Sequence, residues 1–133
     1  MRYLLDTHTF LWAYARSKQL PESVRLTIQD SENEVFVSAV TFWEIAIKLR
    51  AKRLHVGGKT ALDLIDEARK MNFRLISLES EEAASHQHLT EDTHFDPFDR
   101  MLIWQAIGRK LVLISRDPAF DRFKQDGLKL IWK

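Results

Sequence analysis

The chain carries acidic residues at several places where an expected strand ends or an expected helix begins. These residues are Asp6, Glu44, Asp99 and Asp117. Clustered carboxylates repel one another and raise each other's pKa unless a cation offsets their charge. Helix N-termini contribute only ~0.3–1 kcal/mol each, which is too little to hold such a cluster together in ionised form. A bound divalent cation is therefore expected. Oxygen ligands without any cysteine suit Mg²⁺ or Mn²⁺, and an ion of this kind suits phosphodiester hydrolysis.

Each acid also has a purely structural interpretation. Asp6 is a suitable N-cap for a following helix, and Asp117, which directly precedes Pro118, has the same character. Taken one at a time, each of these two positions is about as well explained by a helix N-cap as by a metal ligand.

The other two acids likewise have local alternatives. Glu44 stands three residues after Thr41, which is the spacing of a capping box, and four residues before Lys48, which permits a helical ion pair. If Asp96 caps the next helix, Asp99 occupies its third position and simply complements the helix dipole.

The expected elements place these acids on one side of the molecule. Apolar or β-rich runs predict strands at 3–5, 34–38, 75–78, 111–115 and 128–132. Helices are predicted at 10–16, 21–30, 41–53, 61–71, 81–89 and 97–107, the last closed by Gly108, and a short one follows Pro118. Strands that alternate with helices indicate an α/β fold with a mostly parallel central sheet flanked by helices. The acids follow strands or begin returning helices, so all four are expected at the carboxyl edge of the sheet, where ligands of such folds bind.

Length and composition narrow the class of protein. The 133 residues fit a single domain over residues 1–133, with no repeat or linker. The absence of cysteine excludes a disulfide scaffold and a thiol nucleophile, and it suits a cytoplasmic protein. A net charge of +1, from 20 basic and 19 acidic residues, argues against nucleic-acid binding through bulk positive charge alone. No apolar segment is long enough to span a membrane, and we expect a mature cytoplasmic N-terminus.

Basic, histidine and tryptophan residues supply further candidates. Residues 48–53 contain four basic side chains, which either hold a nucleic-acid backbone near the acids or form a solvated helix face. The histidines at 86, 88 and 94 are expected at the surface. The four tryptophans are expected in the core or at a subunit interface rather than as stacking platforms for bases.

Several of these segments, in this order, resemble one family. They are Leu5-Asp6-Thr7, Ser38 followed by Trp43-Glu44-Ile45, His94-x-Asp96-Pro97-Phe98-Asp99-Arg100, and Ser115-Arg116-Asp117. Together they look like a PIN domain, specifically the VapC-type toxins of bacterial type II toxin–antitoxin pairs, over nearly the whole chain. The resemblance implies a three-layer fold and a Mg²⁺- or Mn²⁺-dependent endoribonuclease. It also implies that Asp6, Glu44, Asp99 and Asp117 are the catalytic, metal-binding acids and that Ser115 supports them. We assign a capping role to Asp96 and a surface role to Asp121. The implied partners are an RNA substrate, a cognate antitoxin protein and a second copy in a homodimer.

Two other functions stay open at this point. A non-catalytic PIN-like binding module would use the acids only as helix caps. A phosphatase with an aspartyl nucleophile would use Asp6, although the sequence lacks the second acid that such enzymes carry two residues later. A nucleotide-binding loop rich in glycine and a Gly-x-Ser-x-Gly hydrolase motif are both absent from the sequence.

Overall fold

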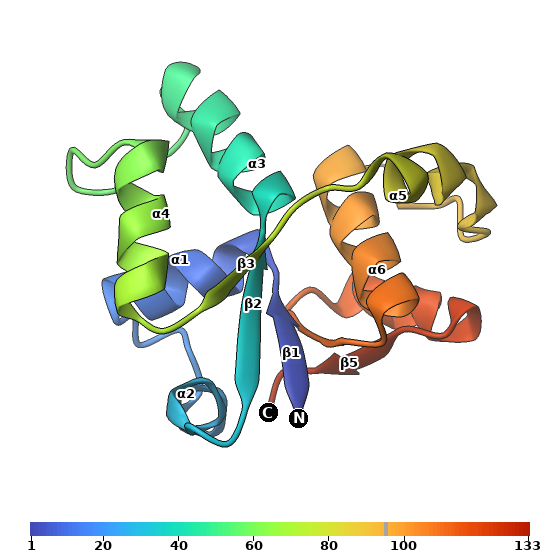
Figure 1. Ribbon diagram of the computed structural model, residues 1–133, viewed down its shortest axis with the longest axis horizontal. Coiled ribbons are helices and arrows are strands. Elements are labelled where there is room, and N and C mark those ends of the chain that lie inside the picture. Colours follow the sequence, from blue (N-terminus) through green and yellow to red (C-terminus); the bar gives the residue numbers. More distant parts are fainter. Residues whose placement is uncertain (95) are drawn as a thin grey trace.

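A single parallel sheet forms the centre of the computed structural model, which describes residues 1–94 and 96–133 (Figure 1). Its strands are β1 (Arg2–Leu5), β2 (Glu34–Ser38), β3 (Arg74–Ile76), β4 (Val112–Ile114) and β5 (Lys129–Ile131), in the order β3-β2-β1-β4-β5. All four pairings between neighbouring strands are parallel. The expected α/β fold with a parallel sheet is therefore confirmed.

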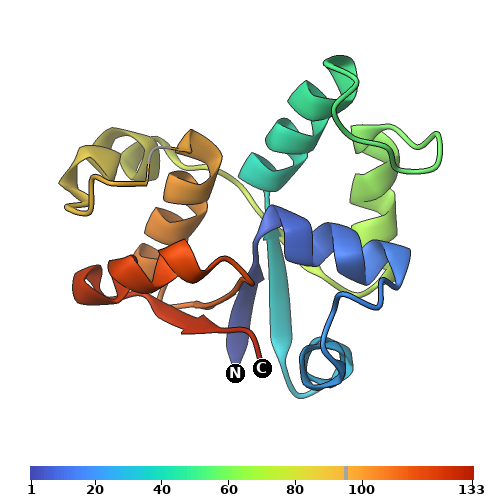
Figure 2. The same ribbon diagram turned by 180° about the vertical axis from the view of Figure 1, so that it is seen from behind.

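Helices cover both faces of this sheet. They are α1 (Thr7–Ala15), α2 (Glu22–Gln29), α3 (Ala39–Arg50), α4 (Ala61–Lys70), α5 (Ser80–Ser85) and α6 (Pro97–Arg109), with 3₁₀ helices η1 (His86–His88) and η2 (Pro118–Asp126). As Figures 1 and 2 show, α1, α2 and α4 lie on one side of the sheet, α5, α6 and η2 lie on the other, and α3 leaves the carboxyl edge. Among the described residues, no helix has both the length and the apolar character needed to cross a membrane.

Alternating side chains of the strands fill two separate cores. Leu5, Val37 and Ile114 are completely buried against α1, α3 and α4. Leu4 and Leu113, on the opposite face, are completely buried against α6 and η2. Successive residues of a strand point to opposite faces, so strands covered on both sides have continuous apolar runs. The two cores hold the carboxyl ends of β1, β2 and β4 in fixed positions.

Several expected helix boundaries are wrong, including the start of α1 at Thr7 and the bounds of α3 at Ala39 and Arg50. Gly108 does not end the sixth helix, because Lys110 adopts the left-handed conformation (φ 58°) and serves as its C-cap, leaving Gly108 inside the helix. Pro21 is the N-cap of α2 rather than its first residue. The helix expected over 81–89 begins at Ser80 and becomes a 3₁₀ turn at His86.

A buried polar network joins α6 to β2 and α5. Gln105 is fully buried; its Oε1 accepts a hydrogen bond from Ser38 Oγ at 2.6 Å, and its Nε2 donates to Ser77 O at 3.1 Å and to Glu82 Oε1 at 3.0 Å. Burial raises the pKa of Glu82, but hydrogen bonds led by that from Arg109 outweigh it and lower the pKa to about 2. Because Ser38 is also the N-cap of α3, the network fixes α3 relative to α6.

We expect Gln105→Leu to lower the free energy of unfolding by about 1–3 kcal/mol, because it leaves the buried hydroxyl of Ser38 without its acceptor and removes one of the hydrogen bonds to Glu82 Oε1. Urea denaturation at pH 7 measures this loss. Gln125→Leu, at an exposed position of η2, is the matched control and should change stability by less than about 0.5 kcal/mol. Equal stability of the Gln105 variant and the wild type would show that the network contributes nothing.

Candidate metal centre

The acids that the sequence singled out lie at the carboxyl edge of the three central strands. Asp6 directly follows β1, Asp117 follows β4, and Glu44 lies in the second turn of α3, which follows β2. Asp99 is in the first turn of α6, which runs back from this edge toward the start of β4. Four separate segments thus bring carboxylates to one edge of the sheet.

Asp6 is a buried acid that accepts hydrogen bonds from Ser115 and Thr9. Its residue is 4% exposed, and Oδ1 accepts a hydrogen bond from the backbone N–H of Thr9 at 2.9 Å. Burial raises the pKa of the carboxyl group, and hydrogen bonds from Ser115 and Thr9 oppose that rise only in part. Ser115 also accepts a hydrogen bond from the backbone N–H of Asp117 at 3.1 Å, so it connects the two segments that carry Asp6 and Asp117.

Glu44 is also buried, at 2% exposure, but it has polar partners on both oxygens. Oε1 accepts a hydrogen bond from the hydroxyl of Thr7 at 2.6 Å, and Oε2 lies 2.5 Å from Nζ of Lys48. The alternative of a capping box with Thr41 is wrong, since α3 begins earlier and Ser38 is its N-cap. The helical pair with Lys48 is observed.

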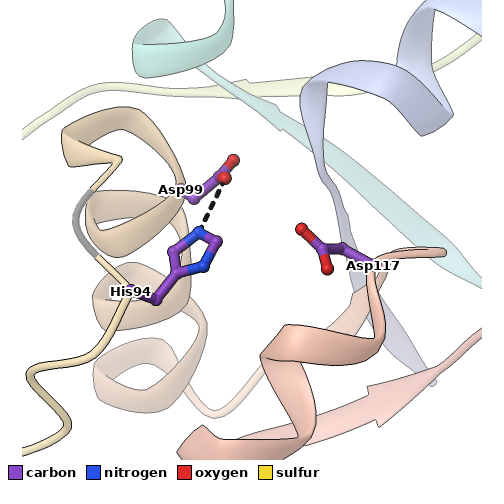
Figure 3. Close-up of side chains that lie close together, drawn as sticks. All are labelled: His94, Asp99 and Asp117. Carbon is purple, nitrogen blue, oxygen red and sulfur yellow. Dashed lines mark hydrogen bonds and ion pairs between the residues drawn. The ribbon is translucent and has the colours of Figure 1, made fainter.

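Asp99, Asp117 and His94 form the tightest group of potential ligands among the described residues. One ligand atom from each of the three lies within 4.8 Å of the other two. Nε2 of His94 is 3.0 Å from Oδ2 of Asp99, and Figure 3 shows Asp117 facing this pair from the start of η2. The structure brings two of the predicted acids together directly, whereas Asp6 and Glu44 lie outside this three-residue group.

His94 is the site residue that the sequence interpretation missed. It was expected at the surface, yet its side chain is only 17% exposed and faces Asp99. Its place in the segment His94-x-Asp96-Pro97, just before the helix that carries Asp99, was the available signal.

The environment of Asp99 disfavours its negative charge. Burial raises its pKa, and the charges of Asp96 and Glu44 raise it further, whereas the hydrogen bond from His94 lowers it. The result is a pKa of about 6. A positive ion next to this carboxyl would relieve the cost of its ionisation.

The capping roles are also real. Asp6, Asp96 and Asp117 are the N-caps of α1, α6 and η2, each accepting a hydrogen bond from a backbone N–H at 2.9 Å. Asp121 is exposed and pairs with Lys124 at 3.1 Å, in keeping with its surface role. A carboxylate has two oxygens and about four acceptor positions, so a capping bond leaves Asp6 and Asp117 able to bind a cation.

The donor set fits a divalent ion. Four carboxylates and one imidazole converge on one sheet edge, and two of the carboxyl groups, Asp6 and Asp99, have pKa values raised by burial. Hard cations such as Mg²⁺ and Mn²⁺ bind carboxylate oxygens of this kind. A cavity of about 820 Å³ lies elsewhere, between α1, α2, α4 and the start of β2, and contains none of these residues.

The basic and aromatic candidates divide between the core and the surface. Arg50, Lys52 and Arg53 are exposed at the end of α3, whereas Lys48 turns back to Glu44. Trp12, Trp104 and Trp132 are partly buried and pack against the two cores, as expected. Trp43 is 58% exposed and meets Phe98 in a T-shaped arrangement, with ring centroids 5.1 Å apart, so it is not a core residue.

Comparisons with known proteins agree with this architecture. The chain matches the PIN domain family over residues 3–125. Its fold is similar to chains of VapBC2 from Rickettsia felis bound to promoter DNA (TM-score 0.68, 17% identity, 100% of both chains covered), VapBC-1 from Haemophilus influenzae (0.64, 15%, 98% and 97%) and FitAcB from Neisseria gonorrhoeae (0.64, 20%, 97% and 96%). At these identities the likeness shows the fold alone. No curated protein matches the sequence.

Proposed function

Because the chain belongs to the PIN domain family, we propose that it is a divalent-metal-dependent endoribonuclease that hydrolyses phosphodiester bonds of RNA. The observation that carries this proposal is the cluster of His94, Asp99 and Asp117 at the carboxyl edge of the sheet, with the buried acids Asp6 and Glu44 on the neighbouring segments. Residues 1–133 form one PIN domain in this proposal.

The residues of such a site divide into ligands and residues that position the ligands. Asp6, Glu44, Asp99 and Asp117 would hold Mg²⁺ or Mn²⁺, which would supply positive charge next to the reacting phosphate and next to an attacking water. Thr7 and Lys48 orient the two oxygens of Glu44, and Ser115 positions Asp6 relative to Asp117. The apolar packing beneath these residues keeps the carboxylates close together before substrate binds.

The basic end of α3 supports RNA as the substrate. Arg50 is exposed at the end of α3, the helix that carries Glu44, and Lys52 and Arg53 are exposed just after it, where they can neutralise phosphates of a bound RNA. The overall charge of +1 includes the acids of the metal site, so with an ion bound the remaining surface is more basic than this sum indicates.

We further propose that the chain is the toxin of a type II toxin–antitoxin pair. The structural neighbours include VapBC and FitAB assemblies, and the motifs of the sequence resemble VapC-type toxins. A cognate antitoxin would cover the metal site. A small gene for a DNA-binding protein directly upstream would support this assignment.

A homodimer would explain why Trp43 and Ile47, one turn apart on α3, are both exposed.

The capping bonds favour one alternative, a PIN-like binding module without catalysis, in which Asp6 and Asp117 act only as N-caps. An aspartyl-nucleophile phosphatase has no comparable support, because Asp6 is buried and bonded to Thr9. An RNA cleavage assay distinguishes the binding module from the proposed endoribonuclease, because only the endoribonuclease cleaves RNA.

The test is cleavage of a labelled single-stranded RNA by the purified chain. We expect cleavage with Mn²⁺ or Mg²⁺, none with EDTA, and a loss of at least ~100-fold in Asp99→Asn, since a site residue has been removed. Asp96→Asn is the matched control. Residue 96 lies three residues before Asp99, and Asn caps a helix as well as Asp does, so this variant should cleave RNA like the wild type. Equal cleavage by the wild type, Asp6→Asn and Asp99→Asn would contradict the active-site assignment.

A further inference from the structure

His94 is held between the two segments that carry Asp99 and Asp117. Its ring meets Phe120 and Phe123 edge-on, with centroids 5.5 and 6.2 Å away and an interplanar angle of 87° in each case. Both phenylalanines belong to η2, whose N-cap is Asp117. The packing that orients the imidazole therefore also sets its position relative to Asp117.

Arg100 fixes the backbone that leads to this histidine. It follows Asp99 on α6, and its guanidinium donates hydrogen bonds to the carbonyl oxygens of Leu89 at 3.4 Å, Glu91, and His94 at 3.1 Å. The same guanidinium lies over the ring of Phe123, 5.9 Å from its centroid. Arg100 thus links the 89–94 segment to the first turn of α6, which carries Asp99. The position of the imidazole is therefore fixed by hydrogen bonds to its backbone and by packing of its ring.

The spacing of the imidazole and the carboxylate suits two ligands of one ion. Two donor atoms at right angles around an octahedral ion, each about 2.1 Å from it, are about 3.0 Å apart. Nε2 of His94 and Oδ2 of Asp99 are 3.0 Å apart, and one ligand atom each of His94, Asp99 and Asp117 lies within 4.8 Å of the other two. The two atoms therefore have the spacing of two adjacent ligands of one ion.

We propose that Nε2 of His94 is a ligand of the divalent ion, together with Asp99 and Asp117, and that this nitrogen makes the site prefer Mn²⁺ to Mg²⁺. Mg²⁺ prefers oxygen ligands, whereas imidazole nitrogen binds first-row transition ions. This inference rests on the proposed metal centre and adds to the four acids a ligand that selects among metals.

Pulsed electron paramagnetic resonance of the full chain, loaded with less than one equivalent of Mn²⁺, tests the ligand directly. We expect echo modulation from a directly coordinated ¹⁴N, which changes to the ¹⁵N pattern when histidine alone is labelled. His94→Gln should lose the modulation, whereas His88→Gln, at an exposed position, should keep it. His94→Asn is a second variant that removes the imidazole with a shorter side chain.

Calorimetric titration with Mn²⁺ and Mg²⁺ gives the second readout. In His94→Gln the affinity for Mn²⁺ should fall at least ~10-fold, and that for Mg²⁺ by less than about threefold. Mn²⁺ that binds to the wild type without nitrogen modulation, or that binds to His94→Gln as tightly as to the wild type, would overturn the role of His94 and leave the acidic metal centre intact. No binding of Mn²⁺ to the wild type would overturn both proposals.

Discussion

Replacing Asp6 by Asn is expected to raise the Tm of the metal-free protein and at the same time to reduce RNA cleavage by at least ~100-fold. The two effects have opposite signs because the carboxylate is costly to fold but necessary for the metal. Asp6 is 4% exposed, and burial raises its pKa. At pH 7 its folding requires either a buried charge or the uptake of a proton, and both cost free energy.

The amide avoids this cost and keeps the local structure. Asn is as good an N-cap as Asp, so its side-chain oxygen can still accept the hydrogen bond from the N–H of Thr9. We expect a gain of ~1 kcal/mol or more, which for a chain of this size is a rise of about 3–6 °C in Tm.

Thermal unfolding in EDTA, followed by circular dichroism, measures the stability, and RNA cleavage with Mn²⁺ measures the activity. Asp121→Asn removes an exposed acid and should change neither quantity. A lower Tm in Asp6→Asn with undiminished cleavage would mean that Asp6 is only a helix cap.

The stability of the metal-free protein should fall as the pH rises through the titration range of Asp99. The folded-state pKa is about 6, raised mainly by burial, against an unperturbed value of 3.8. The folded state therefore binds the proton more tightly than the unfolded state does. The resulting stabilisation is complete below about pH 3.8 and is lost as the pH approaches and passes 6. The side chain is only 24% exposed, and the full change is roughly 3 kcal/mol.

Urea denaturation in EDTA between pH 4 and pH 7.5 measures this contribution as the difference between the wild type and Asp99→Asn, since other groups titrate alike in both. Asp99→Asn should gain stability relative to the wild type as the pH rises, and saturating Mn²⁺ at pH 7 should restore the stability of the wild type alone. If the stabilities of the two proteins changed with pH in the same way, the surroundings of Asp99 would not raise its pKa in the folded state.

The fold was largely predictable because apolar periodicity determines it. All five expected strands exist, and residues 34–38 form one with the expected bounds. The exact ends of the helices were less predictable, since they depend on which residue caps them. Lys110 ends α6 in a left-handed conformation that any sequence rule assigns to the nearby Gly108. Ser38 begins α3 two residues before the expected start because its hydroxyl caps the N–H of Val40.

The site was predictable where a side chain follows a strand directly and less so where long-range contacts place it. The positions of Asp6 and Asp117 follow from parallel strands that end at one edge. The position of His94 depends on Arg100, Phe120 and Phe123, which lie up to 29 residues away, and no spacing within the 86–94 segment reveals these contacts. Thr7, which donates a hydrogen bond to Glu44, is likewise far from it in the sequence, so no local pattern predicts this contact.

The central claim is that carboxylates from four segments form one divalent-cation site, and calorimetric titration with Mn²⁺ at pH 7 tests it most directly. We predict saturable binding to the wild type, weakened at least ~10-fold by each of Asp6→Asn, Glu44→Gln, Asp99→Asn and Asp117→Asn, and unchanged by Asp121→Asn. The same Mn²⁺ affinity in the wild type and these four variants, or no binding to the wild type, would contradict the claim.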